Sequence, residues 1–203
     1  MNPLLPVMAS VGDDETLRFW DLNKKQIIVS KYLGTQATCI QFSPDGSYLV
    51  VGLINGVMLV LEAKVEKLNF GTYMEEYSMP TLEVIMSPKE AKAAVVCLKF
   101  SYRGDFLAVS FNNEYRPEAV KKATNNTTMN QSNLEIGSRE PSFVMIYANR
   151  LSAKNPGIKL NSKDPYIKLM KLVLPLADFQ SSASLRAQLA VTNMDFSEDD
   201  IYL

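Results

Sequence analysis

The 203-residue chain contains no histidine, two cysteines and one tryptophan. The absence of histidine excludes Ser-His-Asp and Cys-His triads, zinc sites that use histidine, and the most common general base. The sequence also has no glycine-rich phosphate loop and no Gly-x-Ser-x-Gly motif. We therefore expect a protein that is not an enzyme and that holds no cofactor and no metal.

The sequence also lacks a marked net charge and a long apolar run. Its formal charge of -1 argues against binding to nucleic acid or to an anionic membrane through bulk charge. No stretch approaches the roughly 20 apolar residues of a spanning helix, and the first residues do not resemble a secretion signal. We expect a cytoplasmic protein, in which Cys39 and Cys97 are small core residues rather than a disulfide or metal pair.

The sequence does contain a motif that recurs at residues 39–52, 97–110 and 193–203. Each copy predicts a strand, a tight turn and a second strand, and we call this motif the recurring phrase. A second phrase, residues 17–21, recurs at 58–62 and 144–148. Trp20 and Leu61 hold the same place in this second phrase and lie 41 residues apart. That spacing falls within the roughly 40 to 45 residue period of a four-stranded propeller blade.

The period predicts an all-β fold, a partial β-propeller of about three blades of four antiparallel strands, open at both ends. Outer strands are expected at 26–31, 66–73 and 166–174, and a further inner strand at 190–197. Propellers normally close with about 4 to 8 blades, so we expect further blades, from the same or another chain, on the two flanks. The predicted units are a blade fragment (1–33), a blade (34–74), a blade (95–174) with an inserted loop (112–141), and the start of a next blade (190–203).

The stretch Ser10-Val-Gly-Asp-Asp-Glu-Thr-Leu-Arg-Phe-Trp-Asp-Leu22 resembles the end of a WD40 repeat, and Phe42-Ser-Pro-Asp-Gly46 adds to that resemblance. Within WD40 proteins the chain is most similar to the echinoderm microtubule-associated protein-like family, through residues 6–14, 42–53 and 55–61. This resemblance implies tandem propellers that bind tubulin or decorate microtubules, including those of cilia.

Two departures from the WD40 pattern are visible. Gly34-Thr35 stands where the family commonly has Gly-His, and the Trp-Asp pair occurs once, its later counterparts being Leu61-Glu62 and Tyr147-Ala148. These changes weaken the hydrogen-bonded network that joins strands in the family. We therefore expect the blades to depend more on apolar packing and on their neighbours.

A basic segment from residue 149 to 171 is the first candidate contact surface. It has six cations and one acidic residue, in a chain whose net charge is -1. One interpretation is a solvated outer strand with its approach loop; the other is a basic edge that faces an acidic partner such as a microtubule. The candidate contacts are Arg150, Lys154, Lys159, Lys163, Lys168 and Lys171.

The inserted loop, residues 112–141, is the second candidate surface. It is polar and its charges balance, so it cannot bind through bulk attraction. It is either a spacer without packed structure or a segment that orders against a neighbour. The candidate contacts are Tyr115, Arg116, Lys121 and Lys122.

Two further features have a structural and a functional interpretation. Asp13, Asp14 and Glu15 could form an acidic metal cluster, but we favour a turn in which carboxylates accept hydrogen bonds from nearby backbone N–H groups. Trp20 could anchor a ligand, but its alternation with Leu17 and Phe19 favours packing within a strand.

These observations lead to a non-enzymatic structural or interaction protein. The leading hypothesis is part of a microtubule-associated WD40 propeller that binds tubulin or neighbouring axonemal proteins, on the cytoskeleton and in the cilium or axoneme. The alternative is a general WD40 scaffold or adaptor in a soluble multiprotein complex. Neither nucleic acid nor membrane is an expected partner.

Overall fold

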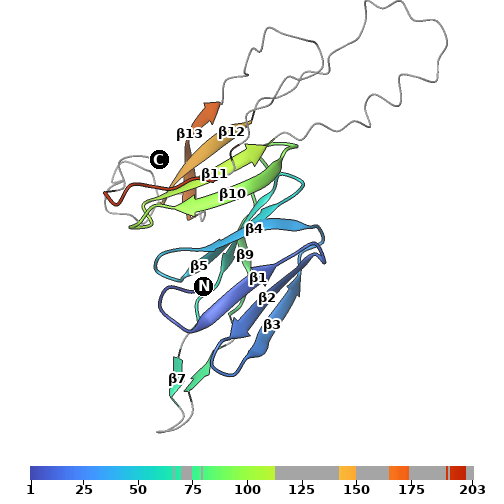
Figure 1. The fold of residues 1–203 in the computed structure, drawn as a ribbon, viewed down its shortest axis with the longest axis vertical. Coiled ribbons are helices and arrows are strands. Elements are labelled where there is room, and N and C mark those ends of the chain that lie inside the picture. The colour runs from blue at the N-terminus through green and yellow to red at the C-terminus, as the bar shows by residue number, and fades with distance from the viewer. Residues whose placement is uncertain are drawn as a thin grey trace, which may run out of the picture.

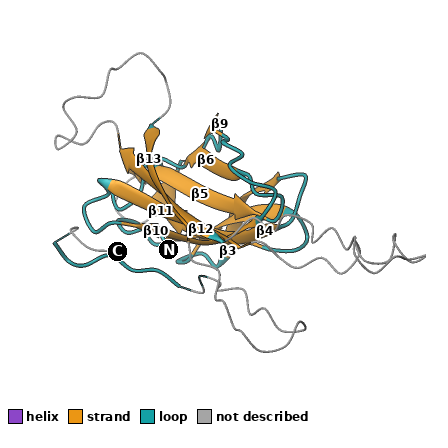
Figure 2. Cartoon of the chain, turned by 90° about the horizontal axis from the view of Figure 1, so that it is seen from above, coloured by secondary structure: helices purple, strands orange, loops and turns teal. Residues whose placement is uncertain are grey.

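The structure is a computed structural model that describes residues 1–65, 67–69, 75–78, 80–112, 142–149, 165–173, 191 and 193–199. These residues form β-strands and loops and contain no helix (Figure 2). Three antiparallel sheets of three or four strands follow one another along the long axis of the molecule (Figure 1). The all-β prediction is confirmed, and the sheets are consistent with part of a WD40 propeller.

Neighbouring strands in each sheet follow one another in the sequence, except that β9 lies next to β6 in the second sheet. The first sheet has the order β1-β2-β3, the second β4-β5-β6-β9 and the third β10-β11-β12-β13, and a separate hairpin pairs β7 with β8. The strands are β1 (Val7–Val11), β2 (Thr16–Asp21), β3 (Gln26–Tyr32), β4 (Ala37–Phe42), β5 (Tyr48–Leu53), β6 (Met58–Glu62), β7 (Lys67–Asn69), β8 (Glu75–Tyr77), β9 (Val84–Met86), β10 (Ala94–Phe100), β11 (Phe106–Asn112), β12 (Phe143–Asn149) and β13 (Tyr166–Val173).

The predicted turns join the expected strands. Gly56, with a φ of 82°, occupies the turn between β5 and β6, and the side chain of Asn55 accepts a 3.1 Å hydrogen bond from the N–H of Val57. Gly46, with a φ of 71°, completes the turn between β4 and β5. Both backbones lie in the left-handed region, which glycine enters without the steric penalty of a side chain.

The outer strand of the second sheet was predicted at the wrong place. It is β9, which pairs with β6, and not the expected stretch 66–73. Part of that stretch does form a strand, β7, but β7 pairs with β8 outside the second sheet. The second sheet therefore extends to Met86, beyond the predicted blade boundary at residue 74.

Two apolar cores hold neighbouring sheets together, because strand residues alternate between the two faces. Leu17 and Phe19 of the first sheet pack with Leu49 and Leu61 of the second. The opposite face of the second sheet packs against the third, in a core that includes the residues Val50, Met58, Val60, Leu107, Val109, Met145 and Tyr147. Each face buries aliphatic side chains, which stabilises the stack by about 25 cal/mol per Å² of apolar area removed from water.

The far face of the third sheet, which is the face turned away from the second sheet, carries Ala108, Val144 and Ile146. Met194 of the C-terminal segment, residues 193–199, packs against these three residues. The side-chain amide of Asn112 donates a hydrogen bond to the carbonyl oxygen of Val191 and accepts one from its backbone N–H. The inner strand expected at 190–197 is not assigned within the described residues of this segment. A strand requires a hydrogen-bonded neighbour, and no strand in the described part of the chain pairs with it.

Candidate functional site

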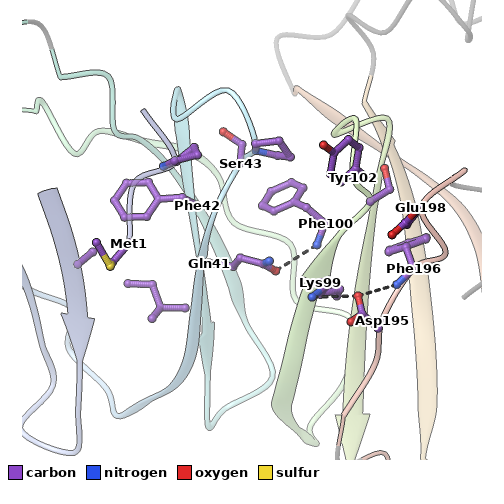
Figure 3. Close-up of a pocket in the computed structure, with 15 residues that line it drawn as sticks. Met1, Gln41, Phe42, Ser43, Lys99, Phe100, Tyr102, Asp195, Phe196 and Glu198 are labelled. Carbon is purple, nitrogen blue, oxygen red and sulfur yellow. Dashed lines mark hydrogen bonds and ion pairs between the residues drawn. The ribbon is translucent and has the colours of Figure 1, made fainter. Parts of the chain in front are cut away.

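An open groove of about 850 Å³ lies along the first strands of the second and third sheets. Figure 3 shows residues of β4 and β10 in the middle of the groove, Met1 at one end, and Asp195 of the C-terminal segment at the other. The three copies of the recurring phrase thus meet in one place. They contribute equivalent residues, namely Gln41, Lys99 and Asp195 before the aromatic position, and Phe42, Phe100 and Phe196 at it.

The polar side chains of the groove link each copy of the phrase to the next. The side-chain oxygen of Gln41 accepts a 3.1 Å hydrogen bond from the backbone N–H of Phe100. In the next copy, the Lys99 amine lies 3.0 Å from the Asp195 carboxylate, and this contact lowers the pKa of Asp195. The same position in consecutive copies therefore bridges consecutive layers of the stack.

The groove offers aromatic rings beside amide, amine and hydroxyl groups. Surfaces of this composition are typical of protein–protein contacts, where rings supply apolar area and polar groups fix orientation. Among the described residues there is no cluster of three or more side chains suited to hold a metal ion. The groove is therefore a candidate binding surface for a protein or peptide.

The sequence analysis did not single out this groove, although a signal was present. The residue before each Phe-Ser pair is Gln41, Lys99 or Asp195, so one position of the repeat is polar in every copy but changes in charge. A repeat position that is polar and variable indicates a side chain that faces a shared surface rather than the core. The sequence alone could not indicate that the three copies converge.

The basic segment is described only in part. Lys168 and Lys171 lie on β13, whereas Arg150, Lys154, Lys159 and Lys163 lie outside the described residues. The contacts expected in the inserted loop, Tyr115, Arg116, Lys121 and Lys122, lie outside them as well. Whether these residues contact a partner stays a prediction.

Both described lysines make contacts within the chain. The Lys168 amine lies 2.5 Å from one carboxylate oxygen of Glu90, whose other oxygen accepts a 3.1 Å hydrogen bond from the hydroxyl of Tyr147. The Lys171 amine lies 3.8 Å from the centroid of the Phe143 ring, a cation–π contact. Glu90 therefore offsets part of the positive charge of this edge.

β13 is also unusual in the apolar residues that it exposes. Leu169, Met170, Leu172 and Val173 each expose between 45% and 54% of their surface. Met170 and Leu172 lie opposite Ile146 and Val144, so they share the far face of the third sheet with the C-terminal segment. The outer part of that face is thus apolar and exposed.

The acidic turn of the first sheet has the structural role that we favoured. Asp14 accepts hydrogen bonds from the backbone and hydroxyl of Thr16 and lies 2.6 Å from the Arg18 guanidinium, which holds the pKa of Asp14 below its usual value. Glu15 accepts a 2.5 Å hydrogen bond from the Tyr32 hydroxyl. These carboxylates close the β1–β2 turn and tie it to β3.

Trp20 makes a hydrogen bond within the first sheet, and the two cysteines pack against apolar clusters. The indole N–H of Trp20 donates a 2.8 Å hydrogen bond to the hydroxyl of Ser10 on the neighbouring strand. Cys39 and Cys97 are free thiols, each half-buried. Cys39 packs against the core between the second and third sheets, and burial raises its pKa to about 11.

The described residues include no helix that is long and apolar enough to cross a membrane.

Residues 29–59 match the family model of the WD domain, G-beta repeat. A stretch of 55 residues, 27% of this chain, is 33% identical to "Cilia- and flagella-associated protein 57 C" of Tetrahymena thermophila, and the match covers 4% of that protein. The chain therefore contains a WD40 repeat, which includes β4, β5 and the start of β6.

Proposed function

We propose that this chain is a non-enzymatic interaction scaffold that forms part of a microtubule-associated WD40 propeller. The observation that carries the proposal is the stack of three sheets with a WD40 repeat at its centre, since such repeats present rigid surfaces to other proteins. A relative named for cilia and flagella supports an axonemal setting. The similarity to the echinoderm microtubule-associated protein-like family supports tubulin or a neighbouring axonemal protein as the partner.

In the proposed contact, the positive charge of one segment of this chain attracts tubulin. The segment 149–171 carries six cations, and the acidic tails of tubulin would be attracted to it. Because Lys168 is paired with Glu90, we assign the larger share of this attraction to Arg150, Lys154, Lys159 and Lys163. Exposed charges are screened by salt, so the attraction should weaken as the ionic strength rises.

Cosedimentation of the 203-residue chain with microtubules at low and moderate salt tests this proposal. Replacing Lys154, Lys159 and Lys163 with Glu should weaken binding by about tenfold or more, because each close charge pair contributes about 1 kcal/mol even in water. The matched control replaces Lys24, Lys89 and Lys92, which are exposed elsewhere, with Glu. Absence of binding at both salt concentrations, or an equal loss in both variants, would contradict the proposal.

A second candidate function rests on the groove. A general WD40 scaffold could hold a peptide against Phe42, Phe100 and Phe196, next to the Lys99–Asp195 pair. Proximity labelling in cells separates the two functions. Tubulin and axonemal proteins among the labelled neighbours favour the first, and subunits of soluble complexes favour the second.

A further inference from the structure

The sequence contains two Ser-Pro pairs, and the fold places their hydroxyl groups in different surroundings. Ser43 of the first pair is 2% exposed, and its hydroxyl accepts a 2.9 Å hydrogen bond from the backbone N–H of Tyr48. Ser87 of the second pair follows β9, the outer strand of the second sheet, and is exposed. The first hydroxyl therefore belongs to the β4–β5 turn, whereas the second meets solvent.

The backbone around Ser87 is extended and has one unpaired edge. β9 pairs with β6, and the antiparallel pairing continues past the end of β9 at a bridge between Val57 and Lys89. The carbonyl oxygen of Pro88 accepts a 3.0 Å hydrogen bond from the N–H of Met58. Backbone groups of neighbouring residues in an antiparallel strand point in opposite directions. The N–H and the carbonyl of Ser87 therefore face the outer edge, where no strand pairs within the described residues.

The side chains of this segment alternate between the two faces of the second sheet. Met86 packs against the core between the second and third sheets, and Glu90 reaches the hydroxyl of Tyr147 in the third sheet. Ser87 and Lys89 consequently point to the opposite face, and both are exposed. The serine thus offers its hydroxyl and its backbone together, as a kinase that binds an extended substrate segment requires.

Pro88 supports this conformation. The residue before a proline is kept out of the helical region and favours an extended backbone. Proline also has no N–H that would need an acceptor in a kinase active site. We propose that Ser87 is a phosphorylation site for a protein kinase that requires proline directly after the serine.

The reaction transfers the γ-phosphoryl group of ATP to Ser87. The Oγ atom forms a bond to the γ-phosphorus, the bond from that phosphorus to the bridging oxygen breaks, and ADP leaves with the electron pair. An aspartate of the kinase accepts the hydroxyl proton. The product carries a charge of about -1.5 to -2. The amine of Lys89 can donate to it, because Lys89 lies on the same face and about 7 Å away along the strand.

The added charge would also act on the basic segment 149–171. Ser87 lies about 10 Å along the strand from Glu90, and the carboxylate of Glu90 contacts the amine of Lys168. The screening length is about 30 Å at about 0.01 M salt, so a phosphate at Ser87 should weaken the attraction of this segment for acidic tails. This consequence, unlike the modification itself, rests on the proposed function.

The first test treats the folded 203-residue chain with ATP, Mg²⁺ and either a cyclin-dependent or a mitogen-activated protein kinase, in separate reactions. Mass spectrometry of the proteolytic fragments then locates the phosphate. It should appear at Ser87, with either kinase, and not at Ser43. Ser87→Ala and Pro88→Ala should each abolish it at this position, with circular dichroism showing that both variants fold.

Free peptides of residues 38–49 and 82–93 are the matched controls, because each contains one Ser-Pro pair outside the fold. Both peptides should be phosphorylated, so that the difference between Ser43 and Ser87 in the chain comes from the fold. Modification of the folded chain at Ser43 as readily as at Ser87 would overturn the proposal. So would an unmodified Ser87 in the folded chain, whether or not the 82–93 peptide reacts.

The second test compares the phosphorylated and unmodified chains in cosedimentation with microtubules. At low salt the phosphorylated chain should bind at least about twofold more weakly, and the difference should shrink at moderate salt. Equal binding of the two forms at low salt would overturn the effect on the basic segment. Absence of binding by the unmodified chain would contradict the proposed function instead, while the fragment masses still decide whether Ser87 is the site.

Discussion

The indole N–H of Trp20 donates a 2.8 Å hydrogen bond to the hydroxyl of Ser10, across the pair of strands that open the first sheet. Trp20 is the one tryptophan of the chain. The third sheet has Tyr147 at the corresponding position, and its hydroxyl donates to Glu90 instead. In the third sheet, the loss of the Trp-Asp pair has thus not removed the polar link at this position but has changed its partner.

The Trp20–Ser10 bond predicts a modest and local loss of stability. Ser10→Ala leaves the indole N–H without its acceptor in a half-buried position, which should lower the free energy of unfolding by about 1 kcal/mol. Urea unfolding followed by tryptophan fluorescence measures this directly, because a single tryptophan reports on the first sheet. Ser30→Ala, at an exposed position of β3, is the control and should change stability by less than about 0.5 kcal/mol.

Two glycines with nearly the same backbone conformation predict different costs of substitution. Gly34 and Gly56 have φ values of 78° and 82°, but a Cβ at Gly34 meets no atom within 4 Å, whereas at Gly56 it would lie 2.2 Å from the carbonyl oxygen of Ala91. Gly34→Ala should cost about 1 kcal/mol, from the left-handed backbone alone. Gly56→Ala adds a clash with backbone and should cost about 3 kcal/mol or more. Equal costs in chemical denaturation would show that the β5–β6 turn does not pack on Ala91.

Burial of the Cys39 thiol predicts a loss of stability at high pH. Its pKa of about 11 in the folded chain exceeds the ordinary value of 9.0. Its contribution is complete below pH 9, because the thiol is then protonated in both states. Between pH 9 and 11 the unfolded chain loses the proton first, so stability should fall by about 2 kcal/mol through this group.

Unfolding of the parent chain and of Cys39→Ala at pH 8 and pH 10.5 isolates this effect. Burial also raises the pKa of Tyr147 and Tyr166, so both proteins should lose stability at the higher pH. The parent should lose more than the variant. The same pH dependence in both would mean that Cys39 does not keep its proton longer in the folded state.

Local patterns were sufficient to predict most strands but not the partner of each. Alternating apolar residues and the Asn55-Gly56 turn specify β5 and β6 and the register between them. The pattern is weaker over the stretch 66–73, where an outer strand was expected; its strand pairs with β8, while the three-residue strand β9 completes the second sheet. Which strand completes a sheet depends on contacts between segments that lie far apart in the sequence. The three residues of β9 are too few to show a clear alternation, so there was no local indication in the sequence that β9 pairs with β6.

The candidate surfaces, too, could be predicted from the sequence only in part. Sequence composition identified the basic segment, because a charge excess is visible without knowledge of the fold. It could not reveal that Glu90, 78 residues before Lys168, lies beside it. Nor could it show that Gln41, Lys99 and Asp195 meet in one groove, since that requires the stacking of three copies of the phrase.

The contacts that join Tyr147, Glu90 and Lys168 predict that substitutions at these three residues lower the free energy of unfolding by different amounts. Tyr147→Phe removes one hydrogen bond but leaves Glu90 paired with Lys168, so it should cost about 1 kcal/mol. Glu90→Leu leaves the hydroxyl of the fully buried Tyr147 without an acceptor and should cost more, about 1 to 3 kcal/mol. Lys168→Met removes the half-exposed partner of an ion pair and should cost less than about 1 kcal/mol.

A double-mutant cycle decides whether these groups act together. If the hydroxyl of Tyr147 depends on Glu90, the variant that combines Tyr147→Phe with Glu90→Leu should cost less than the sum of the two single changes, because no buried donor is left unpaired. Chemical denaturation of the four proteins measures the difference, which we expect to be about 1 kcal/mol. Strict additivity would show that the bond contributes nothing, and that Tyr147 stabilises the third sheet through the packing of its ring alone.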